Sequence, residues 1–221
     1  MSLIDRAGGL AGLGAAIYIL FLPGCICDLW IPTIGMDVGP EDPSALAAKA
    51  FAANGESVRL SAYFGLIAVF LLIMFFSRLH GALRDASGPS SWLPTMALAG
   101  GVLMAGVLLV EIGLGFASSE LSSYGEETQV VKFFVLWGWN SANLLAPPFA
   151  MALVSTTLVA LSAKAFPQWY RWASAALLVL LLLTSGVLRA PGLAIVPGML
   201  WMFLTSFVLA LGPNRGLTQT P

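Results

Sequence analysis

Long apolar stretches separated by short polar segments dominate the sequence. Six stretches stand out, at residues 8–26, 58–76, 93–117, 131–163, 172–188 and 194–211. As helices rising about 1.5 Å per residue, they match the roughly 30 Å thickness of the bilayer hydrocarbon. They lack the strict polar–apolar alternation of barrel strands, and helices satisfy their own backbone hydrogen bonds in lipid. The pattern predicts an all-α, single-domain protein over residues 1–221: a polytopic transmembrane bundle of six helices.

The composition supports a membrane protein and excludes some partners. Hydrophobic residues make up 58% of the chain and charged residues 10%, whereas soluble domains carry about 25% charged residues. The net charge is −1 and no run of basic residues occurs, which argues against nucleic-acid binding. The expected environment is the lipid bilayer.

The charges of the polar segments predict an orientation. One side is expected to hold the N-terminus, the segments 77–92 and 164–171, and the C-terminal tail. Its six cations are Arg6, Arg78, Arg84, Lys164, Arg171 and Arg215, and the opposite side has four cations and most of the acidic residues. Because cations concentrate on the cytoplasmic side, we expect both termini in the cytoplasm and the protein in the bacterial inner membrane.

The first apolar stretch allows two interpretations. Arg6, an apolar run and the sequence Leu-Pro-Gly-Cys at 22–25 are typical of a signal peptide with a lipoprotein cleavage box. We interpret the stretch instead as a signal anchor that serves as the first membrane helix. Gly8 and Gly12 are spaced as Gly-x-x-x-Gly, which favours close packing against another helix.

Cys25 and Cys27 are the only cysteines of the chain. Side chains two residues apart point to different sides of a helix, so a disulfide between them is geometrically poor. With Met36 they form a set of soft ligands that suits a cuprous ion. We favour the interpretation that they are buried small hydrophobes, and we therefore expect no metal site and no cofactor.

The longest polar segment on the outer side predicts a short extracytoplasmic helix at residues 43–53. Asp42 suits the N-cap, Pro43 the first helical position and Asn54-Gly55 the stop.

Three motifs carry a family resemblance. They are Glu-Asp-Pro-Ser at 41–44, Glu-Ser-Val-Arg-Leu at 56–60 and Phe-Pro-Gln-Trp-Tyr-Arg-Trp at 166–172. In these motifs the chain resembles a class of small bacterial polytopic integral-membrane proteins of unknown function. The resemblance implies a bundle of six to seven helices and implies no activity.

Glu111 is the one acidic residue inside an apolar stretch. Helical spacing places it on the same face as Ala97, Gly100 and Met104, where small residues let another helix approach. A charged side chain in the middle of a bilayer costs about 2.5–3.5 kcal/mol or more, so such residues are candidates for function.

Two interpretations of Glu111 stay open. The first, which we favour, is an ion pair with Lys132 or Arg189, both close to the outer ends of their stretches. The second is a role in binding a proton or a cation.

The fourth apolar stretch contains the most unusual sequence. Asn140 and Asn143 lie one turn apart on one face, and Pro147 and Pro148 follow near the middle of the stretch. Proline lacks an amide hydrogen, so we expect a kink or break there, with both asparagines facing the bundle interior. The freed carbonyls and the amide side chains suit a ligand site, although a packing kink covered by a neighbouring helix is the interpretation that we favour.

Trp137 and Trp139 flank these asparagines. Tryptophan is common at membrane interfaces, and the two residues are also candidates for lining the ligand site. The candidate ligand-binding residues are therefore Asn140, Asn143, Glu111, Trp137 and Trp139.

The sequence argues against most enzyme chemistries. His80 is the only histidine, which excludes bis-His haem and a Ser-His-Asp triad within the chain, and no Gly-x-x-x-x-Gly-Lys loop occurs. We expect a non-catalytic accessory or interaction subunit, with a membrane protein or a second copy of the chain as its partner. The alternative is a carrier or receptor for a small apolar or lipid-like ligand.

Overall fold

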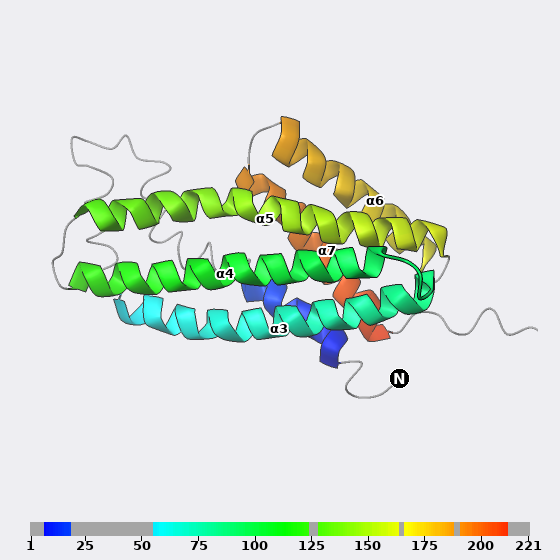
Figure 1. Cartoon of the computed structure of the whole chain (residues 1–221), viewed down its shortest axis with the longest axis horizontal. Helices are drawn as coiled ribbons and strands as arrows, with labels where there is room; N and C mark the ends of the chain where they lie inside the picture. The colour runs from blue at the N-terminus through cyan, green and yellow to red at the C-terminus, as the bar shows by residue number, and fades with distance from the viewer. Residues whose placement is uncertain (1–6, 19–54, 124–127, 164–165, 188–190, 212–221) are drawn as a thin grey trace, which may run out of the picture.

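The computed structural model describes residues 7–18, 55–123, 128–163, 166–187 and 191–211 (Figure 1). Their elements are the N-terminal helix Ala7–Tyr18, α3 (Gly55–Ser87), α4 (Leu93–Ser123), α5 (Thr128–Ser162), α6 (Gln168–Leu182), the π-helical turn η1 (Leu183–Val187) and α7 (Pro191–Leu211). Over these ranges the chain forms helices and no strands, which confirms the all-α prediction. The predicted helix at 43–53, the two cysteines, Met36 and Arg189 lie outside the described residues.

Three of the helices are long and apolar enough to cross a membrane. Their apolar portions are Arg59–Ser87, Leu93–Ala117 and Leu144–Ser162, and two shorter apolar helices are Ala7–Tyr18 and Val196–Leu211. Large apolar side chains cover their outer faces: Phe70 of α3 is 62% exposed and Val102 of α4 is 59% exposed. Apolar surface on this scale is rare on soluble monomers, so the structure has the character of a membrane protein.

Helix α3 corrects one boundary of the sequence prediction. The segment 77–92 was expected to be a loop, but α3 continues to Ser87 and leaves only a short turn before α4. The helix continues because Leu79, Ala82 and Leu83 keep burying one face after the apolar stretch ends. It ends at Gly88, which has a φ of +85° and whose amide donates to the Arg84 carbonyl at 3.0 Å. Glycine adopts this left-handed conformation without steric cost.

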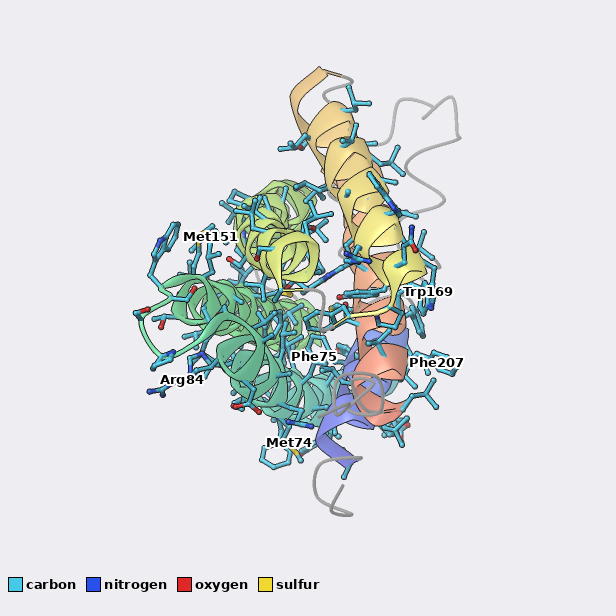
Figure 2. All side chains as sticks on the ribbon, turned by 90° about the vertical axis from the view of Figure 1, so that its right-hand side faces the viewer. Met74, Phe75, Arg84, Met151, Trp169 and Phe207 are labelled. Carbon is cyan, nitrogen blue, oxygen red and sulfur yellow. The ribbon has the colours of Figure 1, made fainter. Side chains whose placement is uncertain are left out.

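The helices form two groups that meet at α5 and at the aromatic core. Helices α3, α4 and α5 lie side by side with α4 in the middle (Figure 1), and α4 packs against both of its neighbours. Helix α5 also packs against α6 and α7, and α7 against α6. Seen from the end at which α3 finishes, α6, α7 and the N-terminal helix lie together on one side (Figure 2).

Aromatic rings fill the space between the two groups. The Trp201 ring of α7 lies 6.2 Å from the rings of both Phe75 and Phe76 of α3, measured between centroids. All three side chains are almost completely buried. Figure 2 shows Phe75 pointing from α3 towards α7, whereas Phe207 lies on the outer side of α7. This cluster joins α3 to α7 through apolar contacts.

Glycines allow the N-terminal helix to pack closely, as its Gly-x-x-x-Gly spacing predicts. A Cβ atom on Gly8 would lie 3.2 Å from the Arg78 Cβ, and one on Gly12 would lie 2.2 Å from the Ser206 Oγ. Between them, a Cβ on Gly9 would lie 2.8 Å from the backbone nitrogen of Ala210. The start of the N-terminal helix and the end of α7 therefore lie side by side.

Of the kink or break expected at the two prolines, the break is absent. Helix α5 runs without interruption from Thr128 to Ser162 with Pro147 and Pro148 inside it (Figure 1). The neighbouring helix explains this continuity, because a Cβ on Gly100 of α4 would lie only 2.7 Å from the Pro148 carbonyl oxygen. Leu145 and Phe149 are also buried on either side. Close packing on both sides of the prolines holds the helix in one piece.

Candidate functional site

Glu111 lies on the face of α4 that the sequence predicted. Ala97 and Met104 on this face are fully buried, and Gly100 packs against α5. Glu111 follows Gly100 by three helical turns and so points to the same side, towards α5. Its side chain is half-buried and engaged in a polar interaction. Glu111 therefore lies on the side of α4 that packs against α5.

The register between α4 and α5 shows which part of α5 Glu111 meets. Gly100 lies opposite residues 148–152, and the two helices run antiparallel (Figure 1). Eleven residues further along α4, Glu111 is level with about residue 139 of α5, because both helices rise about 1.5 Å per residue. Trp139 and Asn140 are thus at the same depth as Glu111 along the bundle.

The remaining candidates lie on this same part of α5, whose backbone is helical. The side chains of Trp137, Trp139, Asn140, Asn143 and Lys132 lie outside the part of the structure that is described. Their convergence on Glu111 stays a prediction.

A tyrosine that the sequence analysis did not single out lies in the same half of the bundle. The Tyr18 hydroxyl donates a hydrogen bond of 3.0 Å to the Ser61 carbonyl. Next to it, a Cβ on Gly65 would meet the Tyr18 hydroxyl and Ile112 of α4. Since Ile112 follows Glu111 directly, the N-terminal helix, α3 and α4 meet at the depth of Glu111.

A second group of polar side chains lies between α6 and α7. The Tyr170 hydroxyl and the Thr205 hydroxyl share a hydrogen bond of 2.7 Å. Ser174 and Trp201 lie beside the same tyrosine hydroxyl, and all four side chains are fully buried. We call Tyr170, Ser174, Trp201 and Thr205 the α6–α7 polar cluster.

Two atoms of the α6–α7 polar cluster bond to no protein atom in the described part of the chain. They are the Ser174 Oγ and the Trp201 Nε1. The Oγ1 of Thr157 on α5 also makes no hydrogen bond to the described part of the chain. Thr157 lies at about the same depth as Ser174, because the two residues are nearly equally far from the α5–α6 turn. The Ser206 Oγ of α7 is also without such a partner, whereas the buried Ser155 hydroxyl bonds to the Met151 carbonyl of its own helix at 2.7 Å.

The sequence carried a weak signal for this cluster. Tyr170 and Ser174 are four residues apart, and so are Trp201 and Thr205, which places each pair on one helix face. The two pairs face each other only because α6 and α7 pack together, and that pairing is not visible in local spacing.

Charged residues lie towards the ends of the described helices. The Arg59 guanidinium of α3 and the Glu120 carboxylate of α4 form an exposed ion pair at one end. Arg78, His80 and Arg84 lie on the last turns of α3 at the other end, and Figure 2 shows Arg84 at the periphery there. Among the described residues no group of three or more His, Cys, Asp or Glu is placed to hold a metal ion.

Comparisons with known proteins give no relative: no protein-family model, no curated protein and no solved structure matches the chain. Any statement about function therefore depends on the residues described above. Their chemistry is that of neutral hydrogen bonding between apolar helices, with one half-buried carboxylate.

Proposed function

We propose that this chain is a non-catalytic subunit of the bacterial inner membrane that acts through contacts with a membrane-protein partner or with a second copy of itself. The observation that carries the proposal is the combination of an apolar outer surface with an interior filled by packed side chains. Twenty-eight large apolar residues are exposed among the described side chains. The interior is occupied by Trp201, the phenylalanines and glycine contacts, and the described ionisable groups do not converge there.

The proposed topology has six spans with both termini in the cytoplasm. The N-terminal helix, α6 with η1, and α7 serve as spans beside the three long apolar helices. The start of the N-terminal helix packs against the end of α7, which supports an even number of crossings. Arg78 and Arg84 lie at that same end, as the positive-inside rule requires of the cytoplasmic side.

We also propose that the chain belongs to the class of small bacterial polytopic membrane proteins of unknown function. The support is the resemblance of the motifs at 41–44, 56–60 and 166–172. Helix α6 begins within the third motif: Tyr170 belongs both to the motif and to the α6–α7 polar cluster. A structural use of the motif suits an accessory role.

A carrier of a small apolar or lipid-like ligand is the second candidate function. The observation in its favour is that Glu111 faces α5 at the depth of Trp139 and Asn140, which are two of the predicted ligand-binding residues. In this proposal Glu111 and the asparagines form the polar part of a site whose remaining lining is apolar.

Purification from native membranes in a mild detergent tests the main proposal. Two differently tagged copies are co-expressed, and the purified material is analysed for stoichiometric partners and for the second tag. We expect a fixed ratio to one partner or to the second copy. A monodisperse monomer that carries neither contradicts the subunit proposal.

The same preparation separates the two functions. Wild type and Glu111→Gln are compared by mass spectrometry of retained small molecules. A carrier loses its ligand in Glu111→Gln at unchanged thermal stability, whereas a subunit retains its protein stoichiometry. For the topology, a cytoplasm-specific reporter fused after Pro221 should be active, and activity of a periplasm-specific reporter at that position would refute the orientation.

A further inference from the structure

The start of α6 holds an arginine between two exposed tryptophans. Trp169 and Trp172 are both exposed, and Figure 2 shows Trp169 at the periphery of the bundle, on the side away from Arg84. Arg171 lies between them in the chain. Tryptophan at the edge of an apolar helix is common at the depth of the lipid headgroups. The start of α6 thus combines a cation with two side chains suited to the membrane interface.

The Arg171 side chain is fixed on the protein at one point and open elsewhere. The residue is partly exposed although its Nε is buried. Among the described residues no acidic side chain forms an ion pair with it. A guanidinium is planar and binds phosphate through two parallel hydrogen bonds. Its charge is therefore available to an anion from outside the bundle.

Arg171 lies at the basic end of the bundle. Tyr170, directly before it, bonds to Thr205 near the end of α7. The end of α7 packs against the start of the N-terminal helix, and so does Arg78 of α3. Among the described side chains this end has three arginines and a single acidic residue. Such an excess of positive charge at a membrane surface attracts anionic lipids.

An exposed apolar stripe continues from this point along α6. It consists of Trp172, Ala176, Val179 and Leu183, which are all exposed and whose spacing places them on one helix face. From Trp172 to Leu183 the helix rises about 16 Å, close to half of the roughly 30 Å of bilayer hydrocarbon. The stripe therefore has the length of an acyl chain in one leaflet.

We propose that the start of α6 binds one anionic glycerophospholipid of the phosphatidylglycerol class. The Arg171 guanidinium binds the phosphate, Trp169 and Trp172 flank the headgroup, and an acyl chain lies along the stripe as far as Leu183. A soluble anion would use the arginine alone, whereas a lipid uses both the arginine and the stripe. The inference rests on the proposed placement of α6 with η1 as a membrane span and is independent of a protein partner.

Native mass spectrometry of the full chain, released from detergent micelles, tests the site directly. The protein is titrated with dioleoyl phosphatidylglycerol and, separately, with dioleoyl phosphatidylcholine, whose headgroup has no net charge. Wild type should retain phosphatidylglycerol more tightly. Arg171→Gln should weaken this retention about fivefold, the effect of one arginine at an anionic membrane surface. Equal retention of the two lipids by wild type overturns the proposal.

Arg84→Gln is the matched control. Arg84 lies at the same end of the bundle but on α3, and Figure 2 shows it on the side opposite to Trp169. This variant should retain phosphatidylglycerol as wild type does. Equal weakening in Arg84→Gln and Arg171→Gln would show that the lipid responds to the overall charge of this end, which contradicts a site on α6.

Competition identifies the source of the phosphate. Inorganic phosphate and deacylated glycerophosphoglycerol are each added to the complex of the chain with phosphatidylglycerol. Neither should displace the lipid at equal concentration, because neither contacts the apolar stripe. Displacement by inorganic phosphate would show a site for a free anion and would refute the lipid proposal.

Thermal unfolding in nanodiscs separates lipid binding from a loss of fold. Wild type should unfold at a higher temperature in phosphatidylglycerol than in phosphatidylcholine. Arg171→Gln should lose most of this difference while its midpoint in phosphatidylcholine stays at the wild-type value. Equal destabilisation in both lipids would give Arg171 a structural role instead. A missing lipid preference together with the expected reporter signal after Pro221 refutes only this site and leaves the proposed topology intact.

Discussion

The α3–α4 and α6–α7 interfaces hold their helices together by different means. Between α3 and α4, glycines let large side chains pack against the opposite backbone: a Cβ on Gly101 would lie 2.2 Å from the Phe76 ring. Between α6 and α7, a buried tyrosine–threonine hydrogen bond and its polar neighbours face each other. Lipid is as apolar as the side chains, so helices in a bilayer associate through close packing and hydrogen bonds rather than through the hydrophobic effect. Close packing at glycine is the means at the α3–α4 interface, and hydrogen bonding is the means at the α6–α7 interface.

The largest expected effect is on a glycine contact of α4. In Gly100→Ala the new methyl group would lie 2.7 Å from the Pro148 carbonyl oxygen and 3.2 Å from the Ala152 nitrogen. Backbone atoms cannot rotate away, so α4 and α5 must separate, and we expect a loss of about 1–3 kcal/mol. Thermal unfolding in detergent, followed by tryptophan fluorescence, measures it.

The matched control is Gly106→Ala on the same helix. No atom lies within 4 Å of a Cβ at this position, so alanine should leave stability unchanged or raise it by up to about 1 kcal/mol through helix propensity. Equal losses in both variants would show that glycine packing is not what holds α4 and α5 together.

A smaller effect is expected in the α6–α7 polar cluster. Tyr170→Phe removes the 2.7 Å hydrogen bond to Thr205 and should cost about 1 kcal/mol, close to the average of about 0.6 kcal/mol for hydrogen bonds between membrane helices. Tyr63→Phe is the control, since Tyr63 is 68% exposed. If both variants unfold at the wild-type temperature, hydrogen bonding does not stabilise this interface.

The smallest effect is expected at the end of the α3–α4 interface. Arg59→Gln breaks the ion pair with Glu120. The Arg59 side chain is 51% exposed and the Glu120 side chain 29% exposed, and exposed pairs contribute at most about 1 kcal/mol to stability. The loss should shrink further in high salt. Arg84→Gln, at the other end of α3, controls for the removal of a charge. A loss at Arg59 as large as that in Gly100→Ala would show that this ion pair stabilises the fold as much as the glycine packing between α4 and α5.

Sequence patterns were sufficient to predict that the described elements are helices and to identify the inward face of α4. Apolar runs predict helices because the bilayer requires every backbone group to be bonded within its own segment. Glu111 could be placed because helical spacing joins it to Ala97, Gly100 and Met104. The extension of α3 to Ser87 was missed because its last turns change from an apolar run to an amphipathic pattern.

Contacts between distant segments could not be predicted in this way. Tyr170 and Thr205 are 35 residues apart, and local spacing does not say which helices become neighbours. A kink or a break was expected at Pro147 and Pro148, and the break is absent for a related reason. The cost of proline was judged on an isolated helix, whereas the packing of Gly100 against Pro148 keeps this helix continuous.

The length of α3 has a consequence for how the protein sits in its bilayer. Its candidate membrane span, Arg59–Ser87, has 29 residues, about 43 Å at 1.5 Å per residue, against roughly 30 Å of hydrocarbon. A tilt of about 20°, the average for membrane helices, reduces the mismatch by only a few ångströms. In such a bilayer the turns with Arg78, His80 and Arg84 would extend beyond the hydrocarbon into the headgroup layer. The turn at Gly88 follows the end of α3, and its exposed residues Pro89 and Ser90 offer a position that accommodates an inserted epitope.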